Sequence, residues 1–295
     1  MSSIRRFSAL LLIALTIQLF TAVDATAQSS YEPFQWQPGW ERAGWLTVGS
    51  IGALFAGGAG IQYGIGAPTE PNWTGPVLFD DATRSSMLPS TQAGIERAGQ
   101  VSDVLMAGLI AAPVLVEPAM ALLGHDNPDA AGQVALMNAQ ALGATFFATT
   151  ALKHLIGRQR PPEGACYDNP EADPSCAERD TLSFPSGHTS MSFAGAGLVC
   201  LNHEQFQPLG GPWDKAACYT ALGAAATVGA LRIASNSHYL TDVVAGAALG
   251  LAGGYLLPKW LYFGFGDDMG VLSDGGGSIT PQVGEVNGVQ LNFTW

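Results

Sequence analysis

The stretch VLMAGLIAAPVLVEPAMALLG, residues 104–124, is almost entirely apolar and is long enough to span a bilayer as a helix. Between about Gly44 and Trp260, similar apolar segments alternate with polar connections rich in Gly and Pro. None of these segments alternates apolar and polar residues with period two, so the sequence predicts an all-α bundle of about six helices. The expected helices are 45–65, 102–124, 132–156, 187–202, 216–234 and 239–257.

The composition limits the class of protein. Charged residues make up 12% of the chain and hydrophobic residues 47%, which excludes a disordered chain and favours a membrane or membrane-adjacent protein. The formal net charge of −12 argues against nucleic acid as a partner. Several expected helices are rich in Ala and Gly, and small residues allow close helix packing in water as well as in a bilayer. Both a membrane-embedded and a soluble bundle are therefore open interpretations.

The first 27 residues have the organisation of a secretory signal peptide. The basic segment MSSIRR precedes the apolar segment FSALLLIALTIQLF, and ATA at 25–27 is a small-x-small cleavage site. The mature chain is expected to begin near Gln28 and to fold outside the cytoplasm. We expect a helical catalytic domain over 28–262 and a separate tail over 263–295.

The four cysteines fit an oxidising compartment. Cys166 and Cys176 bracket the polar loop YDNPEADPS, which predicts a local disulfide. Cys200 and Cys218 flank a second loop; a soluble exported bundle predicts a bridge there, whereas a membrane-spanning one predicts reduced thiols on the cytoplasmic side. Free thiols are the alternative for both pairs, and neither pair has the C-x-x-C spacing of a zinc site.

The chain changes character after Trp260. DGGG at 274–277 is a flexible break, and Asn287-Gly288 is a strong signal for a hairpin turn. The apolar residues that then alternate with polar ones are Val289, Leu291, Phe293 and Trp295. The tail is therefore expected to form a small β-hairpin packed on the bundle.

Positively charged residues are few, so the position of each is informative. The stretch KHLIGRQRPP begins with Lys153, and Arg160 follows seven residues later, directly before Pro161. Seven residues are two helical turns, so both cations can face one direction until the proline stops the helix.

Two further stretches add candidate site residues. LSFPSGHTS places Ser186-Gly187-His188 at the expected start of a helix, where backbone N–H groups bind anions. LRIASNSHYLTDVV supplies Arg232, followed by His238 and Asp242 at a spacing that places both on one face of a helix. An Arg among apolar residues keeps its charge and indicates an anion. A structural Arg–Asp pair beside a core histidine is the alternative.

The motifs K-x6-R-P, P-S-G-H and R-x5-H-x3-D, in this order, resemble those of the type 2 phosphatidic acid phosphatase (PAP2) family. That family shares its site with vanadium haloperoxidases and bacterial class A acid phosphatases. The resemblance covers about residues 45–260. It departs from the family pattern at Leu231, where the family usually has Ser, so one hydroxyl beside the phosphate is expected to be absent.

The resemblance implies a role for each motif residue. His238 would attack phosphorus and form a phosphohistidine, and Asp242 would orient its imidazole. His188 would protonate the leaving oxygen and then activate water. The groups expected to bind the phosphoryl oxygens are Lys153, Arg160, Arg232 and the backbone around Ser186 and Gly187. No metal or other cofactor is implied, because the cations neutralise the phosphate.

The remaining polar residues near the motifs are interpreted as bystanders. Ser186 is not expected to be a nucleophile, because FPSGH lacks the G-x-S-x-G pattern. His154 is assigned no role. Arg158 is expected to be solvated, with assistance at the mouth of the cleft as the alternative. His125 and His203 are expected on the surface.

The resulting hypothesis is a metal-independent phosphatase acting on a phosphomonoester or pyrophosphate group. The apolar helices favour a lipid substrate, such as phosphatidate, phosphatidylglycerophosphate or a polyprenyl pyrophosphate, and membrane lipids as surroundings. A soluble periplasmic acid phosphatase is the alternative, and a vanadate-dependent haloperoxidase or a non-enzymatic envelope protein fits less well. The site is expected at one end of the bundle, facing the periplasm of a bacterial cell, with the bundle in or on the inner membrane. Protein partners cannot be predicted from the sequence.

Overall fold

Long helices form most of the chain that the computed structural model describes, which comprises residues 34–161, 181–264, 277–282 and 288–293. The main helices are α2 (Trp45–Gly64), α3 (Asp80–Met87), α4 (Gln92–Ala111), α6 (Pro128–Ile156), α8 (Gly187–Phe206), α9 (Pro212–Ala234) and α10 (Leu240–Leu251). The segments that continue α4 and α10 are the π-helical turns η1 (Ala112–Val116), η2 (Met120–Gly124), η4 (Ala252–Leu256) and η5 (Lys259–Phe263), with the short α5 (Glu117–Ala119). The signal peptide and the Cys166–Cys176 pair predicted from the sequence lie outside the described residues.

The all-α prediction is confirmed, with two differences in detail. The helix expected to begin at 102 begins at Gln92, because Thr91 caps it by accepting a hydrogen bond from the Gly94 N–H at 3.2 Å. The sequence pattern missed this boundary because the first ten residues of α4 are mostly Ala, Gly and polar residues, with Ile95 and Val101 as the only large apolar ones. It also missed α3, whose sequence DDATRSSM carries no apolar periodicity.

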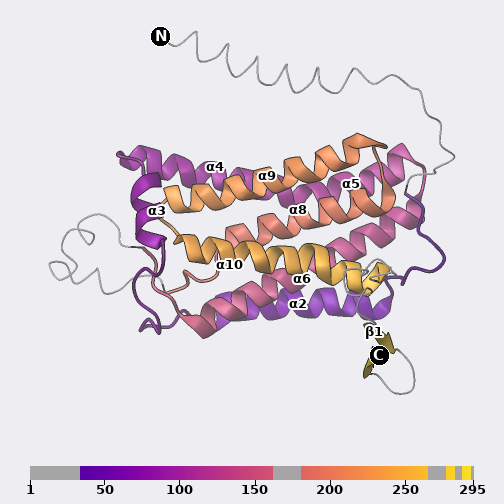
Figure 1. Cartoon of the computed structure of the whole chain (residues 1–295), viewed down its shortest axis with the longest axis horizontal. Helices are drawn as coiled ribbons and strands as arrows, with labels where there is room; N and C mark the ends of the chain where they lie inside the picture. Colours follow the sequence, from indigo (N-terminus) through magenta and orange to yellow (C-terminus); the bar gives the residue numbers. More distant parts are fainter. Residues whose placement is uncertain (1–33, 162–180, 265–276, 283–287, 294–295) are drawn as a thin grey trace, which may run out of the picture. The chain divides into compact units, whose positions relative to one another are not determined.

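Helix α8 lies at the centre of the bundle and packs against α4, α6, α9 and α10 (Figure 1). Glycines allow this close packing. A Cβ atom on Gly195 would lie 2.2 Å from the carbonyl oxygen of Leu109 in α4, and one on Gly254 would lie 2.1 Å from the carbonyl oxygen of Ala194. The backbones of α8 and its neighbours therefore touch directly, as small residues allow.

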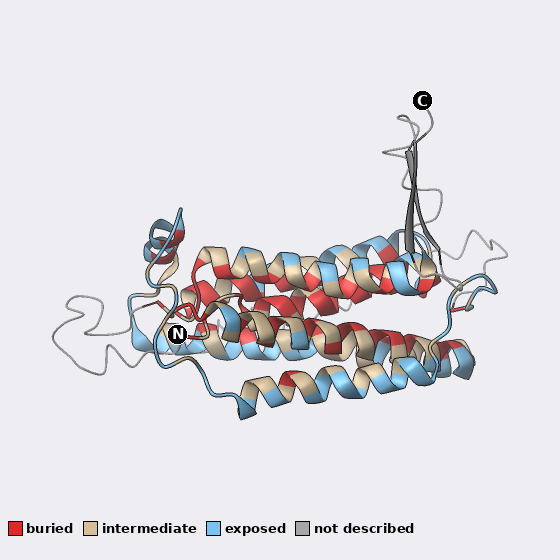
Figure 2. Ribbon diagram, turned by 90° about the horizontal axis from the view of Figure 1, so that it is seen from below, coloured by how far each residue is buried: buried red, intermediate tan, exposed pale blue. Residues whose placement is uncertain are grey.

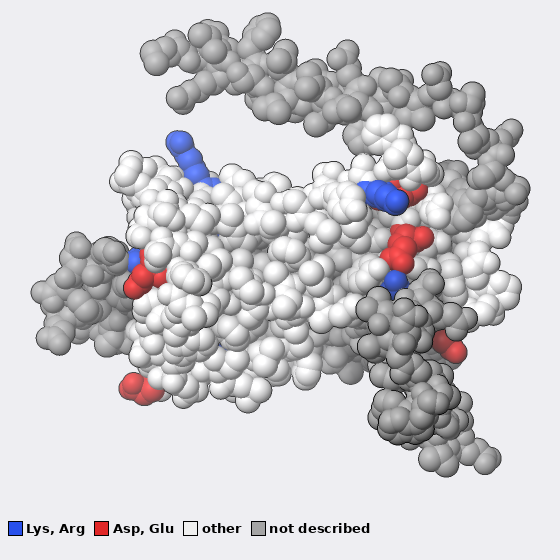
Figure 3. Space-filling model, in the orientation of Figure 1, with Lys and Arg blue, Asp and Glu red and all other residues white. Residues whose placement is uncertain are grey.

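The outward sides of the helices are apolar. In the part of the chain that the structure describes, three helices are long and apolar enough to cross a membrane: Gln92–Gly124, Pro212–Ala234 and Leu240–Phe263. At most a third of the most apolar 18-residue stretch of each helix is buried. Buried residues line the sides of the helices that face one another, whereas the outward sides are exposed (Figure 2). On the face drawn in Figure 3, the described charged residues lie toward the two ends and the middle carries none. This pattern fits a bundle that associates with a membrane.

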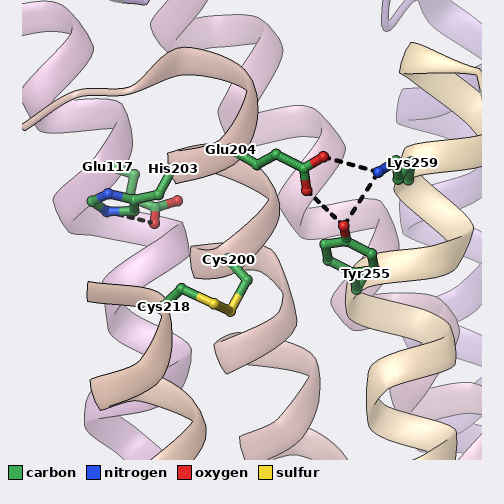
Figure 4. The surroundings of a disulfide bond; sticks show 7 residues. All are labelled: Glu117, Cys200, His203, Glu204, Cys218, Tyr255 and Lys259. Atoms are coloured by element: carbon green, nitrogen blue, oxygen red, sulfur yellow. Dashed lines mark hydrogen bonds and ion pairs between the residues drawn. A yellow bond between two sulfur atoms is a disulfide. The ribbon is translucent and has the colours of Figure 1, made fainter. Parts of the chain in front are cut away.

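A disulfide and a buried polar cluster lie near the C-terminal end of α8 (Figure 4). Cys200 and Cys218 are bonded, which joins α8 to α9. The surface position expected for His203 is wrong: its ring is buried, with Nδ1 2.7 Å from Asp214 Oδ1 and Nε2 3.9 Å from Glu117 Oε1. The chain turns back after α8, and Asp214 in the first turn of α9 contacts this ring. No local sequence pattern predicts this contact.

The expected hairpin in the tail is present, but its turn differs from the prediction. Strand β1 (Gly277–Gln282) pairs antiparallel with β2 (Gly288–Phe293), with Gly277 opposite Phe293 and Gln282 opposite Gly288. Gly288 therefore belongs to the second strand and not to a two-residue turn. The connection, 283–287, lies outside the described residues.

The close approach of α8 and α4 predicts a cost for any side chain at position 195. Gly195→Ala places its Cβ on the Leu109 carbonyl and forces the helices apart, which we expect to destabilise the fold by about 1–3 kcal/mol. Gly223→Ala is the matched control, because a Cβ at that exposed position in α9 meets nothing within 4 Å. There, the higher helix propensity of Ala should stabilise the fold by up to about 1 kcal/mol. Thermal unfolding in detergent measures both; equal midpoints for the two variants would contradict the packing argument.

Candidate active site

The end of α6 brings the first motif to the site. Gly157 follows the helix in the left-handed conformation, with φ of 57°, and its N–H bonds to the Lys153 carbonyl. The chain turns there, so Arg160 lies beyond the helix and not two helical turns along it as the spacing suggested. The Lys153 side chain is buried and donates a hydrogen bond to the Leu182 carbonyl. It thus reaches the segment that carries the second motif.

The second motif begins α8. Ser186 caps the helix: its buried hydroxyl accepts hydrogen bonds from the N–H and the hydroxyl of Thr189. The N–H groups of Gly187 and His188 precede Thr189, and backbone N–H groups at such a helix start can bind an anion. A Cβ on Gly187 would lie 3.3 Å from Lys153 Cε, so the cation of the first motif lies directly beside this helix start.

The third motif lies between α9 and α10. Arg232 is in the last turn of α9, His238 is in the connection, and Asp242 is in the first turn of α10. His238 precedes the helix, so the helical i, i+4 pairing expected from the sequence is not formed as such. Its Nδ1 nevertheless lies 3.6 Å from Asp242 Oδ2, a contact slightly longer than a hydrogen bond.

His238 is the point at which all three motifs meet. Its side chain is 1% exposed. Burial, together with the positive charges of Lys153, Arg160 and Arg232, holds the pKa of His238 well below its ordinary value. The imidazole is therefore neutral near pH 7, which leaves one ring nitrogen with a lone pair. His188 also acts on this pKa, so the second motif lies close to the same ring.

Arg158 holds Asp242, and its expected solvated position is wrong. The side chain is fully buried between Asp242 and Asp80, with Nη1 2.5 Å from Asp242 Oδ1 and Nη2 2.7 Å from Asp80 Oδ2. Its guanidinium stacks on the rings of Trp73 and Tyr239, at 4.0 and 4.3 Å from their centroids. An Arg can be buried in this way because two carboxylates compensate its charge.

The second oxygen of Asp242 is held as well. Oδ2 accepts hydrogen bonds from the Ser183 hydroxyl at 2.6 Å and from the Tyr239 N–H at 2.9 Å. Together with Arg158, these donors fix the carboxylate in one orientation beside His238. The alternative interpretation pairs the Asp242 carboxylate with Arg232, but in the structure the cation that pairs with Asp242 is Arg158.

Helix α3 supports this arrangement from outside. Asp80 accepts hydrogen bonds from the N–H and hydroxyl of Thr241, both at 2.9 Å, in addition to its ion pair with Arg158. Arg84, one turn further along α3, donates from Nε to Asn236 Oδ1 at 2.6 Å. Both ends of the segment that carries His238 are thereby attached to α3.

Helix α4 contributes two polar residues to the site. His188 Nε2 lies 2.8 Å from Asp103 Oδ1, and Arg232 Nη1 lies 3.7 Å from the same oxygen. Ser102 accepts a hydrogen bond from Arg232 Nη1 at 3.1 Å. A hydroxyl therefore does contact Arg232, although the residue before it is Leu231.

The pKa of His188 is also displaced. Burial and the charge of Arg232 lower it to about 4, while Asp103 acts in the opposite direction. In the empty site His188 is therefore neutral near pH 7. A bound phosphate would add negative charge beside it and favour its protonated form.

The structure thus brings together the candidate residues of all three motifs and adds four that the sequence did not identify. Those four are Asp80, Asp103, Arg158 and Ser183. Arg158 carried a usable signal, because a third cation within the first motif needs a partner. Asp80 and Asp103 are far from the motifs in sequence, and only the packing of α3 and α4 reveals their role.

Comparison with known proteins finds matches to phosphatases over the part of the chain that carries the three motifs. The model of the PAP2 superfamily matches residues 134–264. A probable diacylglycerol pyrophosphate phosphatase 1 of Schizosaccharomyces pombe is 29% identical over 131 residues, 38% of this chain and 47% of that protein. Lipid A 1-phosphatase of Porphyromonas gingivalis is 40% identical over 74 residues, 25% of this chain and 15% of that protein. Lipid phosphate phosphatase 2 of Arabidopsis thaliana is 34% identical over 121 residues, 35% of this chain and 42% of that protein.

A solved structure is also similar. It is that of a transmembrane PAP2-type phosphatidylglycerolphosphate phosphatase from Bacillus subtilis, with a TM-score of 0.47, 19% identity, and coverage of 72% of this chain and 94% of that one. The chain spans less than half the length of the curated relatives above. All three motifs, from Lys153 to Asp242, fall within the matched residues 134–264, so the similarity to the PAP2 superfamily covers the whole candidate site.

Proposed function

We propose that this protein is a metal-independent phosphatase that hydrolyses a phosphomonoester or pyrophosphate group of a lipid through a phosphohistidine at His238. One observation carries the proposal: the charges of Lys153, Arg160 and Arg232 all act on one buried neutral imidazole, and Lys153 lies beside the start of α8. Cations and helix N–H groups converging on one point suit a phosphoryl group, and a neutral imidazole suits a nucleophile.

In the first step, a ring nitrogen of His238 attacks phosphorus. Because Nδ1 faces Asp242, Nε2 is the nitrogen that remains for the attack. The N–P bond forms as the bond between phosphorus and the leaving oxygen breaks, and His188 gives that oxygen a proton. Asp242, fixed by Arg158, stabilises the positive charge that develops on the imidazole.

In the second step, water replaces the histidine. His188, now neutral, takes a proton from the water as its oxygen bonds to phosphorus, and the N–P bond breaks. The cations that held the phosphoryl oxygens in the first step hold them again as charge develops on them. Inorganic phosphate leaves, and His238 returns to its neutral form.

A lipid is the substrate class that the surroundings of the site favour. The relatives described above are named for diacylglycerol pyrophosphate, lipid A and lipid phosphate. The helices around the site expose large apolar side chains, among them Val101 and Val104 of α4 and Val244 of α10. A phosphorylated head group can therefore enter the polar end while its acyl chains stay in contact with apolar helix surfaces.

We place the protein in the bacterial cell envelope, exported by the signal peptide over 1–27 and with its site facing the periplasm. The Cys200–Cys218 disulfide supports an oxidising compartment for the opposite end of α8. Thirteen residues of α8 separate Gly187 from Cys200, which corresponds to about 20 Å along the helix. With both ends exported, the bundle would associate with the membrane without exposing loops to the cytoplasm. The disulfide also favours the second candidate, a soluble periplasmic acid phosphatase.

The nucleophile is tested by phosphate release in detergent with EDTA present. Wild type should release phosphate from phosphatidate, phosphatidylglycerophosphate or a polyprenyl pyrophosphate, and His238→Ala should lose activity by a factor of about 10⁴ or more. His125→Ala is the control, because this ring lies against Phe34 at the far end of the bundle. Residual activity of His238→Ala near the wild-type level would refute the assignment. A preference for a soluble aryl phosphate over every lipid would support the acid phosphatase instead.

Because Arg158 is buried between two carboxylates, we expect that its replacement by Lys lowers activity even though the positive charge is kept. The ammonium of Arg158→Lys cannot bond Asp242 and Asp80 through two separate nitrogens, so Asp242 should shift and kcat should fall by about 10²-fold. Arg42→Lys is the control, since that Arg also pairs with an Asp but in an exposed position. Turnover of Arg158→Lys equal to wild type would show that Asp242 does not depend on Arg158.

The orientation is tested with single cysteines introduced at the two ends. Asp129→Cys lies at the disulfide end and Ser85→Cys, in α3, at the site end; both positions are exposed. A membrane-impermeant maleimide applied to spheroplasts should label both, and Cys200 and Cys218 should react only after reduction. Protection of Ser85→Cys until the membrane is dissolved would place the site in the cytoplasm. Labelling of Cys200 without reductant would show that the disulfide is not formed in the cell.

A further inference from the structure

Asp103 belongs to the site, although it lies 31 residues before the matched residues 134–264. It projects from α4 toward the start of α8, where its Oδ1 lies 2.8 Å from Nε2 of His188. The His188 side chain is 29% exposed and the Asp103 side chain 59%, so the pair lies at the open side of the site. A substrate that enters from this side would contact His188, whose ring is already fixed by its hydrogen bond to Asp103.

The chemistry of a carboxylate fixes the proton arrangement of His188. An ionised carboxylate can only accept a hydrogen bond, so Nε2 of His188 must carry the hydrogen. In the neutral ring Nδ1 then holds the lone pair. The proton exchanged during the reaction must therefore be the one on Nδ1, since Nε2 is occupied by Asp103.

We propose that Asp103 is a positioning residue for His188: by accepting the Nε2 hydrogen bond, it directs Nδ1 to the leaving oxygen of the substrate and stabilises the protonated ring. This inference rests on the proposed function and adds a residue to it. In the first step the Nδ1 proton passes to the leaving oxygen as the P–O bond breaks. In the second step Nδ1 takes a proton from the attacking water.

The charges around His188 explain why such a residue is needed. Arg232 of α9 and Lys153 of α6 both disfavour a proton on this ring, and the buried His238 lies close by. Asp103 of α4 is the group that favours the proton, through its hydrogen bond and its charge. Its Oδ1 is also 3.7 Å from Arg232 Nη1, so the carboxylate offsets part of the cationic field that opposes protonation.

The leaving group offers a way to detect this role. An alkoxide leaving group, as in phosphatidate, needs a proton as the P–O bond breaks, whereas p-nitrophenolate leaves readily without one. Loss of Asp103 should therefore slow the first substrate much more than the second. A general defect in folding or in phosphate binding would slow both equally.

The experiment compares wild type, Asp103→Asn and Glu96→Gln on phosphatidate and on p-nitrophenyl phosphate in the same detergent. Glu96 is the matched control: it is an exposed carboxylate two turns earlier on the same face of α4. For Asp103→Asn we expect kcat/KM to fall by about tenfold or more on phosphatidate and by less than about threefold on the aryl ester. Inhibition by inorganic phosphate should not weaken, because the negative charge beside Arg232 is removed and the phosphate-binding cations remain.

The pH profile gives a second readout. Without the carboxylate, the pKa of His188 falls further, so its protonated form is lost at lower pH. The basic limb of kcat/KM for phosphatidate should therefore move to lower pH in Asp103→Asn, and Asp103→Glu should restore it at least in part. Glu96→Gln should leave the profile in place.

Equal losses on both substrates, an unchanged pH profile or unchanged rates would each overturn the role of Asp103. In all three cases wild-type activity would leave the proposed function standing. A wild-type protein inactive toward both substrates would instead contradict the proposed function and this inference with it.

Discussion

The structure must hold three mutually repelling cations close to one buried imidazole. These cations are Lys153, Arg160 and Arg232, and the arrangement of the other elements depends on this constraint. The pKa of His238 reflects it, because each of these cations lowers that value. Cations of like charge remain close together only if the elements that carry them are held rigidly. Here the three elements are α6, the segment after it and α9, and α8 lies against both helices. Direct backbone contacts at Gly195 and Gly254 keep α8 in place against its other neighbours.

The carboxylates near this group of cations are arranged so as not to neutralise it. Asp242 is needed beside His238, but its charge is taken up by Arg158 on the far side, which also pairs with Asp80. A direct Asp242–Arg232 pair would have neutralised one of the cations proposed to bind phosphate. Because Arg158 pairs with Asp242 instead, Arg232 remains available for the phosphate-binding role proposed for it.

The sequence was sufficient for the fold class, for the start of five of the six expected helices to within four residues and for the residues of the three motifs. Those motifs combine rare charges with fixed spacing, so a single sequence reveals them. Arg158 was misjudged because its environment is made by α3, whose eight residues lack any apolar pattern. The same holds for His203, which is buried by the fold of the α8–α9 connection. In both cases a polar side chain is buried by partners distant in sequence, and local periodicity carries no information about such partners.

Asp103 lies outside the three motifs, on the helix α4 that packs beside them. The proposed nucleophile and the proposed phosphate-binding cations all lie between Lys153 and Asp242, within the matched residues 134–264. The proton balance of His188 instead depends on α4, through a carboxylate that is 59% exposed and makes a contact with Arg232 in addition to the one with His188. An exposed group on a separate helix can change without disturbing the buried network of Arg158 and Asp242. The acidity of His188, the proposed general acid, can therefore vary while the proposed phosphate-binding cations stay the same.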